Sequence, residues 1–275
     1  MIDRLTHFIV LIAMGTMIGT AAFAHTKADV GGSDFDEATA LQISQGAIGR
    51  DVGDHRLLDV AGEPRHLDEF HGRPLVISLI YTSCSHTCPV LTQNLAGVVK
   101  VAQEALGEDS FNVVSIGFDA PVDTPERMRV YAHEQGIQSP NWVFLSADAK
   151  TIELLTNDLG FIFFPSPKGF DHIAQTTVLD AEGRVYRQVY GENFSTPALV
   201  EPLKELVFGN RADGNILSNW INGVRLFCTI YDPASGRYRF DYSLFITIGV
   251  GLISLGSVLV FVLRAWRQSS PPGAV

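Results

Sequence analysis

The sequence predicts an α/β protein with a central mixed sheet, helices on its faces and a membrane segment after it. Short apolar runs alternate with segments whose apolar residues recur at helical spacing, which is typical of an open and largely parallel sheet. The last two apolar runs, Ile173 to Asp180 and Arg184 to Tyr190, predict an antiparallel hairpin. Near the carboxyl end, Leu244 to Leu263 is twenty residues without a charge, enough to cross a hydrocarbon core of about 30 Å.

The predicted elements follow one another as strand, helix, strand, helix, strand, helix, hairpin and helix. The first strand is apolar at nearly every position, as expected when both faces are buried. Thr124 before Pro125 is a predicted helix N-cap, and Gly107, Gly136 and Gly160 are predicted helix ends. The ranges are strands 74–81, 111–118 and 141–145, helices 89–106, 124–135 and 149–159, hairpin strands 173–180 and 184–190, and helix 197–208.

Both ends of the chain carry segments expected to meet a membrane. Residues 8–24 are uncharged and follow Arg4, which predicts an export signal, with an uncleaved anchor as the alternative. Arginines flank the second apolar segment on both sides, so the positive-inside rule does not give its orientation. The export signal alone predicts that the domain lies outside the cytoplasm and that the tail lies inside it. The predicted order is signal peptide 1–24, flexible lead-in 25–50, α/β domain 51–210, juxtamembrane extension 211–243, transmembrane helix 244–263 and cytoplasmic tail 264–275.

Composition excludes several classes of protein. The net charge of −10 argues against nucleic acid as a partner, because nucleic-acid binding needs a basic surface. Charged residues make up only 18% of the chain, which agrees with a part that lies in lipid. Three cysteines are too few for a disulfide scaffold, so local chemistry is the expected role of any cysteine.

Two of these cysteines lie where the first strand passes into its helix. Cys84 and Cys88 are four residues apart, with Pro89 in the first helical turn. The amides and dipole of a helix N-terminus stabilise a thiolate, so two reactive sulfurs are expected. Residues four apart on a helix have Cβ atoms about 5–6 Å apart, whereas a disulfide needs about 3.8 Å. The spacing therefore favours a metal whose ligands can still cycle through a disulfide.

The chemistry of the ligands indicates which metal. Two thiolates favour Cu(I), and an added imidazole would also accommodate Cu(II). Structural zinc normally needs four protein ligands, and there is no second cysteine pair. His172 precedes a strand expected to lie beside the strand of the cysteines, and His86 lies between them. On the residues alone, His172, His86 and a purely structural histidine remain alternatives.

Four further motifs follow one another over roughly residues 50–210. They are Gly72-Arg73-Pro74-Leu75-Val76, Tyr81-Thr82-x-Cys84-x-x-x-Cys88-Pro89, Phe118-Asp119 with Asp123-Thr124-Pro125-Glu126, and Asp171-His172. Together they give this chain a resemblance to the SCO/SenC family. The resemblance implies a thioredoxin-like fold and copper as cofactor, and it places Cys84, Cys88 and His172 on the metal ligands, with Cys84 and Cys88 as the redox pair of any catalysis. Asp119 falls on an acidic position of the family, which is interpreted as supporting the ligands or the fold and not as a ligand.

The resemblance also implies a function and partners. Members of the family help to assemble cytochrome c oxidase, so the expected client is the subunit that carries CuA or another cuproprotein, with an upstream copper donor and the membrane as further partners. The expected location is the inner membrane, with one C-terminal span and the main domain in the periplasm. Most members are anchored at the N-terminus, and residues 226–238 resemble an element of a bacterial branch whose client is in doubt.

Other interpretations of the cysteines remain open. A thiol–disulfide oxidoreductase that reduces client cysteines would use the same pair without a histidine. A peroxidase and a structural disulfide in a periplasmic binding module are weaker alternatives. Cys228 is either a buried apolar residue or a third thiol that receives copper or forms an intermolecular disulfide.

Overall fold

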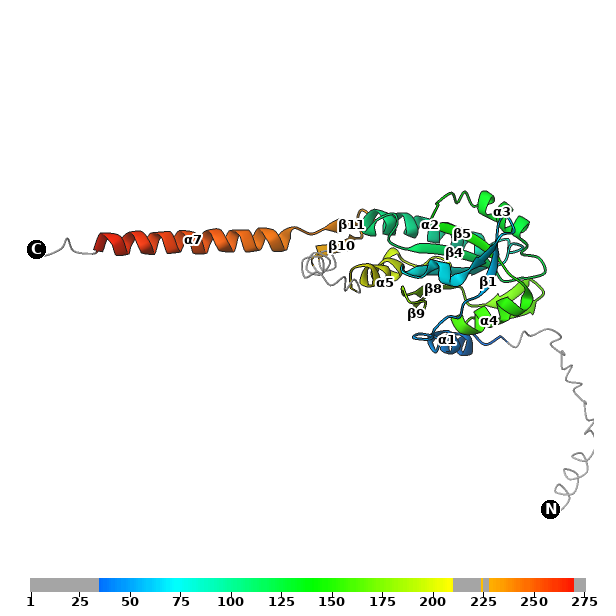
Figure 1. The fold of residues 1–275 in the computed structure, drawn as a ribbon. Helices are drawn as coiled ribbons and strands as arrows, with labels where there is room; N and C mark the ends of the chain where they lie inside the picture. The colour runs from blue at the N-terminus through cyan, green and yellow to red at the C-terminus, as the bar shows by residue number, and fades with distance from the viewer. Residues whose placement is uncertain (1–34, 210–223, 225–227, 270–275) are drawn as a thin grey trace, which may run out of the picture. The chain divides into compact units, whose positions relative to one another are not determined.

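The computed structural model describes residues 35–209, 224 and 228–269, and Figure 1 labels most of its helices and several of its strands. The predicted signal peptide and much of the predicted juxtamembrane extension lie outside these residues. In chain order the elements are α1 (Glu37–Gln45), β1 (Arg56–Asp59), β2 (Pro64–His66), the 3-10 turn η1 (Leu67–Phe70), β3 (Leu75–Ile80), α2 (Thr87–Leu106), β4 (Asn112–Gly117), α3 (Pro125–Glu134), β5 (Trp142–Ser146), α4 (Ala149–Leu159), β6 (Phe163–Ser166), β7 (Gly169–His172), β8 (Gln175–Leu179), β9 (Val185–Tyr190), α5 (Thr196–Gly209), β10 (Thr229–Asp232), β11 (Arg237–Phe240) and α7 (Ser243–Ser269).

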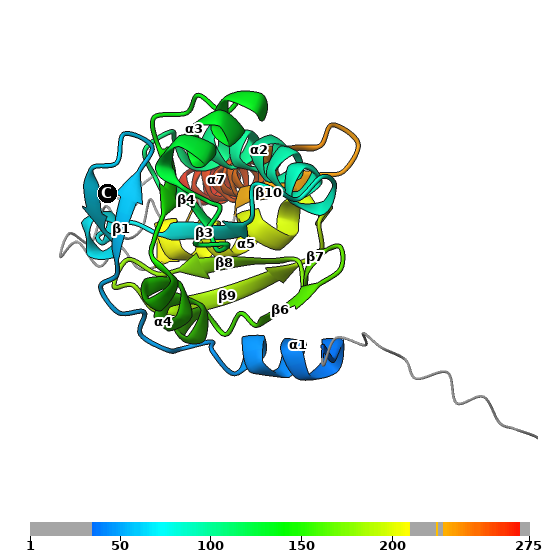
Figure 2. The ribbon, with the colours of Figure 1, turned by 90° about the vertical axis from the view of Figure 1, so that its right-hand side faces the viewer.

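The main sheet has seven strands in the order β2-β1-β5-β4-β3-β8-β9. Strands β3, β4 and β5 run parallel, whereas β8 and β9 are antiparallel neighbours on one side and β1 and β2 on the other. Figure 2 shows α2 and α3 on one side of the sheet and α4 and α1 on the other. The predicted α/β class with a mixed sheet flanked by helices is therefore confirmed.

Strand β3 is an interior strand of the sheet, and both of its faces are covered. All six of its residues are buried, and it pairs with β4 in parallel register from Leu75 opposite Asn112 to Ile80 opposite Gly117. Its carboxyl end leads directly to the cysteine corner. Gly117, at the end of β4, has no room for a side chain, because a Cβ there would lie 2.4 Å from the Cβ of Asp123.

Most predicted elements are present, and their ends follow the expected local signals. Helix α4 has the predicted bounds, with Gly160 in the left-handed conformation at its end. Helix α3 begins after Thr124, whose hydroxyl accepts a hydrogen bond from the N–H of Arg127. Helix α2 begins at Thr87, two residues before the predicted start.

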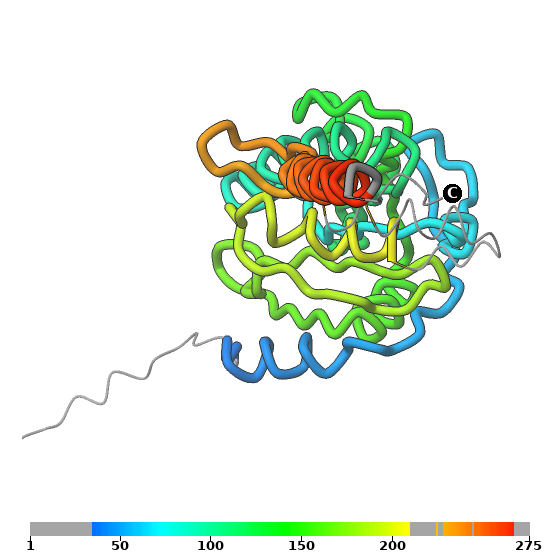
Figure 3. Tube along the Cα trace, turned by 90° about the vertical axis from the view of Figure 1, so that its left-hand side faces the viewer, coloured from blue at the N-terminus to red at the C-terminus, as the bar shows by residue number. Residues whose placement is uncertain are grey.

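The predicted flexible lead-in is wrong for residues 37–50. Helix α1 begins after Asp36, whose carboxylate accepts from the N–H of Thr39, and it buries Ala40 and Ser44. The chain then pairs with β9 through the hydrogen bond from Gly49 N to Val185 O. The residues that α1 buries are small, so the segment lacks the strong apolar periodicity from which a helix is predicted. Figure 3 shows the backbone of α1, in blue, along the edge of the domain.

Helix α7 is the candidate membrane span and overlaps the predicted segment. Phe245–Trp266 has 22 residues and a mean hydropathy of 2.5, and none of its most apolar window is buried. Among the described residues it is the one helix long and apolar enough to cross a membrane. Helix α7 continues to Ser269, so Arg264 and Arg267 of the predicted tail lie within the helix.

The hairpin β10–β11, which precedes α7, is attached to α5 by buried polar contacts. Lys204 is only 7% exposed, and its Nζ donates to the carbonyl oxygen of Thr229 at 2.9 Å and pairs with Glu201 at 2.8 Å. The Tyr238 hydroxyl donates to the other Glu201 oxygen at 2.8 Å. A buried ammonium group is tolerated only with such partners, so this part of the predicted juxtamembrane extension belongs to the folded domain.

Replacing Gly160 by alanine tests whether α1 is part of the folded domain. Both Gly160 (φ +64°) and Gly136 (φ +67°) are left-handed, but only at Gly160 would a Cβ meet neighbours, 2.8 Å from Ile43 O and from the Ala47 Cβ. We expect Gly136→Ala to lower the free energy of unfolding by about 1–2 kcal/mol and Gly160→Ala by about 1–3 kcal/mol more. Urea unfolding of the full chain in detergent measures both, and equal losses would contradict the packing of α1.

Candidate metal centre

The turn between β3 and α2 brings Cys84 and Cys88 together. The N–H of Cys84 donates to the carbonyl oxygen of Tyr81 at 3.1 Å, which closes the turn after β3. Cys88 is the second residue of α2 and is 1% exposed, whereas Cys84 is half-buried on the loop before the helix. Both are free thiols. The structure therefore confirms the predicted corner and gives its two sulfurs different environments.

The Cys84 sulfur caps the N-terminus of α2. His86 occupies the N-cap position without a capping hydrogen bond from its side chain, and the N–H of Cys88 instead donates to Cys84 Sγ at 3.3 Å. The Cys88 thiol, the N–H of His86 and the Tyr81 hydroxyl also donate to this sulfur. These hydrogen bonds, the one from the Cys88 thiol first, lower the pKa of Cys84 to about 4.

Cys88 has the opposite character. Its hydrogen bond to Cys84 and its burial raise the pKa of the Cys88 thiol far above its usual range. The expectation of two reactive sulfurs is therefore wrong in one respect, because Cys84 is the thiolate and Cys88 is a buried thiol that donates to it. Two adjacent thiolates in one small site would repel each other, so one proton is shared between the pair.

His172 lies at the end of a short strand. It is the last residue of β7 and pairs with Phe163 of β6. Pro165 lies in the edge hairpin β6–β7, where its missing N–H is tolerated. The ring of His172 packs among aromatic rings with centroids at 5.4 Å (Phe118), 5.4 Å (Phe161) and 6.0 Å (Tyr81).

The hydrogen bond of this ring decides which nitrogen can bind a metal. Nδ1 of His172 lies 2.9 Å from the carbonyl oxygen of Ile173. A carbonyl only accepts, so Nδ1 carries the hydrogen and Nε2 keeps its lone pair when the ring is neutral. Burial lowers the pKa of His172, although the hydrogen bond to Ile173 and the charge of Cys84 act in the opposite direction. A neutral ring with a free Nε2 is the form that binds metals.

Asp123 is a structural residue of this corner that the sequence analysis did not single out. Its carboxylate is 1% exposed and accepts from the N–H and hydroxyl of Thr82, at 2.8 and 2.7 Å, and from the N–H of Asp119 at 2.9 Å. It thereby ties the loop before Cys84 to the loop after β4. Burial raises the pKa of Asp123 and that of the less buried Asp119. Its position before a helix N-cap gives no signal of this burial.

The three predicted ligands share one end of the sheet but do not form a closed site. The candidate ligand atoms of Cys84, Cys88 and His172 do not all lie within 4.8 Å of one another. In the described part of the chain, another group of residues meets this limit. The aromatic ring of Tyr81 lies against His172, and its hydroxyl reaches Cys84. The donor set of one thiolate, one thiol and one imidazole fits copper.

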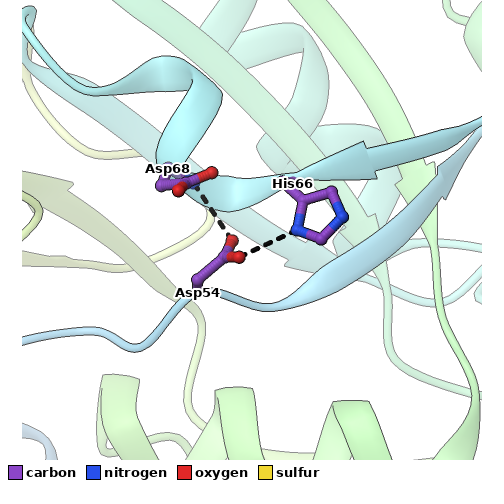
Figure 4. Close-up of side chains that lie close together, drawn as sticks. All are labelled: Asp54, His66 and Asp68. Atoms are coloured by element: carbon purple, nitrogen blue, oxygen red, sulfur yellow. Dashed lines mark hydrogen bonds and ion pairs between the residues drawn. The ribbon is translucent and has the colours of Figure 1, made fainter.

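The compact cluster consists of Asp54, His66 and Asp68, all exposed at the edge of the sheet (Figure 4). Asp54 accepts from His66 Nδ1 at 2.8 Å and from the N–H of Asp68 at 3.4 Å. Glu69 in turn accepts from the backbone N–H of His66, which completes a capping box at η1. These polar groups thus bond one another and stabilise the turn.

The remaining residues of interest lie outside the candidate centre or at its rim. His86 is exposed beside Cys84. Cys228 is 5% exposed at the start of β10, which agrees with its interpretation as a buried apolar residue.

Comparisons with known proteins point to one family. The family model described as SCO1/SenC matches residues 46–207 of this chain. Protein SCO2 homolog, mitochondrial, of Mus musculus is 26% identical over 170 residues, which are 59% of this chain and 64% of the mouse protein. The chain thus spans less than two thirds of the length of this curated relative.

Solved structures share the fold. A protein of Aquifex aeolicus described as a candidate electron transfer protein superposes with a TM-score of 0.54 and 28% identity, covering 62% of this chain and 99% of that one. Yeast Sco1 with copper bound superposes with a TM-score of 0.51 and 18% identity, covering 62% of this chain and 98% of that one.

The asymmetry of the two sulfurs predicts how they react with an alkylating agent. Because the pKa of Cys84 is lowered to about 4 while that of Cys88 is raised, Cys84 is a thiolate above pH 4 and becomes a thiol as the pH falls through that value. We expect iodoacetamide at pH 6 to modify Cys84 first, at a rate that falls with a midpoint near pH 4 on acidification. Mass spectrometry of the labelled peptide measures this, with unfolded protein as control. A midpoint between pH 8 and 9 would contradict the assignment.

Proposed function

The chain belongs to the SCO1/SenC family, and from this membership and the cysteine corner we propose that it is a membrane-tethered copper-binding protein. It delivers copper to the CuA centre of cytochrome c oxidase or matures that centre. The observation that carries the proposal is the Cys84 thiolate next to Cys88, with His172 turned so that Nε2 keeps its lone pair. Yeast Sco1, which has the same fold, was solved with copper bound.

The ligands differ in what they require of incoming copper. Cys84 meets the ion as a thiolate, and His172 meets it as a neutral imidazole. Cys88 must release its proton when it binds, so copper uptake releases about one proton per ion and weakens as the pH falls. The same coupling favours release of copper when Cys88 regains a proton.

The proposed location follows from the candidate membrane span and the export signal. Helix α7 tethers the domain to the inner membrane, and the domain lies in the periplasm. A tethered domain meets membrane-embedded clients at a raised effective concentration. The partners are an upstream copper donor and the oxidase subunit that carries CuA, or another cuproprotein.

A second function, thiol–disulfide exchange, is favoured by the different pKa values of the two sulfurs. The Cys84 thiolate attacks a client disulfide, which forms a mixed disulfide and releases one client sulfur as thiolate. Cys88 then attacks Cys84 Sγ, passes its proton to the client sulfurs and closes the Cys84–Cys88 disulfide. Two electrons move from this chain to the client, whose sulfurs leave as one thiol and one thiolate, and the thiolate takes up the second proton from water. Reduced client cysteines are the form that binds copper.

Anaerobic copper titration of the full chain in detergent tests the first function. We expect one copper ion per reduced chain, and loss of stoichiometric binding in Cys84→Ala and Cys88→Ala. His172→Ala should weaken Cu(II) binding by at least about 100-fold and Cu(I) binding less, because two thiolates suffice for Cu(I). His133→Ala, an exposed histidine on α3, is the matched control. Absence of binding, or no effect of His172→Ala, would refute the assignment, whereas an equal effect of His86→Ala would make His86 a ligand.

Single serine variants test the order of thiol–disulfide exchange. With a peptide disulfide as client, Cys88→Ser should accumulate a mixed disulfide at Cys84, because the resolving thiol is missing. Cys84→Ser should form no adduct at pH 7: the pKa of Cys88 is raised by its hydrogen bond to Cys84 and then by burial, and the burial remains in this variant. Non-reducing gels with peptide mapping measure the adducts. Equal trapping in both variants would contradict the proposed order.

A further inference from the structure

The hairpin β6–β7, which carries His172, is contacted on both of its faces. Phe163, Phe170 and His172 share one face, because residues two apart on a strand, or opposite each other in the register, point the same way. Phe164 points to the other face, where its ring packs edge-on against the ring of Phe35, with centroids 6.4 Å apart. Phe35 precedes α1, so this outer contact comes from the amino-terminal side of the domain.

A cavity of about 440 Å³ adjoins His172 on the side of α1. Phe35 and Leu41 line it from α1 and the residues before it, and Tyr190 lines it from β9. His172 and Ala174 form the wall that belongs to β7 and the segment after it. Side chains that face open space lack packing partners there. The contact with Phe35 therefore gives the hairpin support that the sheet does not give across this opening.

Helix α1 is itself held against the sheet, so Phe35 is attached to a fixed support. Ser44 is fully buried, and its hydroxyl oxygen lies 2.8 Å from that of Tyr190 on β9, which also accepts from Gln45 Nε2 at 2.6 Å. A Cβ at Gly160, which ends α4, would meet atoms of α1 at 2.8 Å. Figure 2 shows α1 below β9 and β6.

We propose that Phe35 is a positioning residue of the copper site, which holds the hairpin β6–β7 through Phe164 and thereby keeps His172 in place for the metal. The inference rests on the proposed copper function. A ligand whose hairpin is held on both faces has fewer conformations to lose when it binds a metal. Both Phe35 and α1 precede residues 46–207, which the family model matches, so this support comes from outside the matched part of the chain.

The variant Phe35→Leu in the full chain removes the ring and keeps an apolar side chain. We expect the affinity for Cu(II), which uses the imidazole, to fall by about 3- to 10-fold. The affinity for Cu(I) should not change, because two thiolates suffice for Cu(I). Phe35→Tyr, which keeps the ring, should restore Cu(II) binding. In the metal-free protein, the backbone amides of β6 and β7 should exchange faster in Phe35→Leu than in the wild type.

Two controls separate positioning from a general effect on the fold. Tyr231→Leu removes the half-buried ring of another aromatic pair, whose centroids lie 5.3 Å apart on the hairpin β10–β11, and it should leave Cu(II) binding unchanged. In the His172→Ala background, Phe35→Leu should weaken Cu(II) binding no further, because the two residues then act through one interaction.

Several results would overturn the inference. They are an unchanged or higher affinity for Cu(II) in Phe35→Leu, equal losses for Cu(I) and Cu(II), or additive losses in the double variant with His172→Ala. A wild-type chain that binds no copper would overturn the proposed function and the copper role of Phe35 together. The exchange of the β6 and β7 amides would then still show whether Phe35 holds the hairpin.

Discussion

The contact of Cys84 Sγ with the thiol and the N–H of Cys88 is the interaction on which the chemistry of this protein depends. Helix α2 has no side-chain cap from His86, so its first amides point at a sulfur instead of an oxygen. A sulfur that satisfies helix N–H groups is stabilised as a thiolate. That charge in turn keeps the proton on Cys88, and both proposed functions begin from this unequal pair.

The sequence predicted those parts of the fold whose signals are local. Helix α4 has a strong apolar stripe and a terminal glycine, and its bounds were predicted in full. Helix α1 was missed because it buries small side chains, Ala40 and Ser44, which give no apolar periodicity. The hairpin β6–β7 was missed because Pro165 and Pro167 argue against strands. At the edge of a sheet, however, a proline lacks only an N–H that would have faced solvent, so it is tolerated there.

The candidate site shows a similar division. The strand-to-helix position of Cys84 and Cys88 could be predicted from the spacing of apolar residues and Pro89. Which sulfur is charged could not, because it depends on the hydrogen bonding between the two sulfurs and on the burial of Cys88 in the folded chain. Likewise Asp123, which ties two loops through three hydrogen bonds, is recognisable only once Thr82 and Asp119 are seen to meet it.

Copper binding and thiol exchange compete for the same thiolate, and His172 is the feature that separates them. Exchange needs a nucleophilic sulfur and a resolving sulfur, and an imidazole adds nothing to either step. Yet this half-buried imidazole packs among aromatic rings, which disfavour its charged form, and its Nδ1 is fixed by the carbonyl of Ile173. Burial of a polar ring with one nitrogen left free has a desolvation cost. That cost is recovered when Nε2 binds a metal, so the arrangement of His172 favours the copper function over a purely redox one.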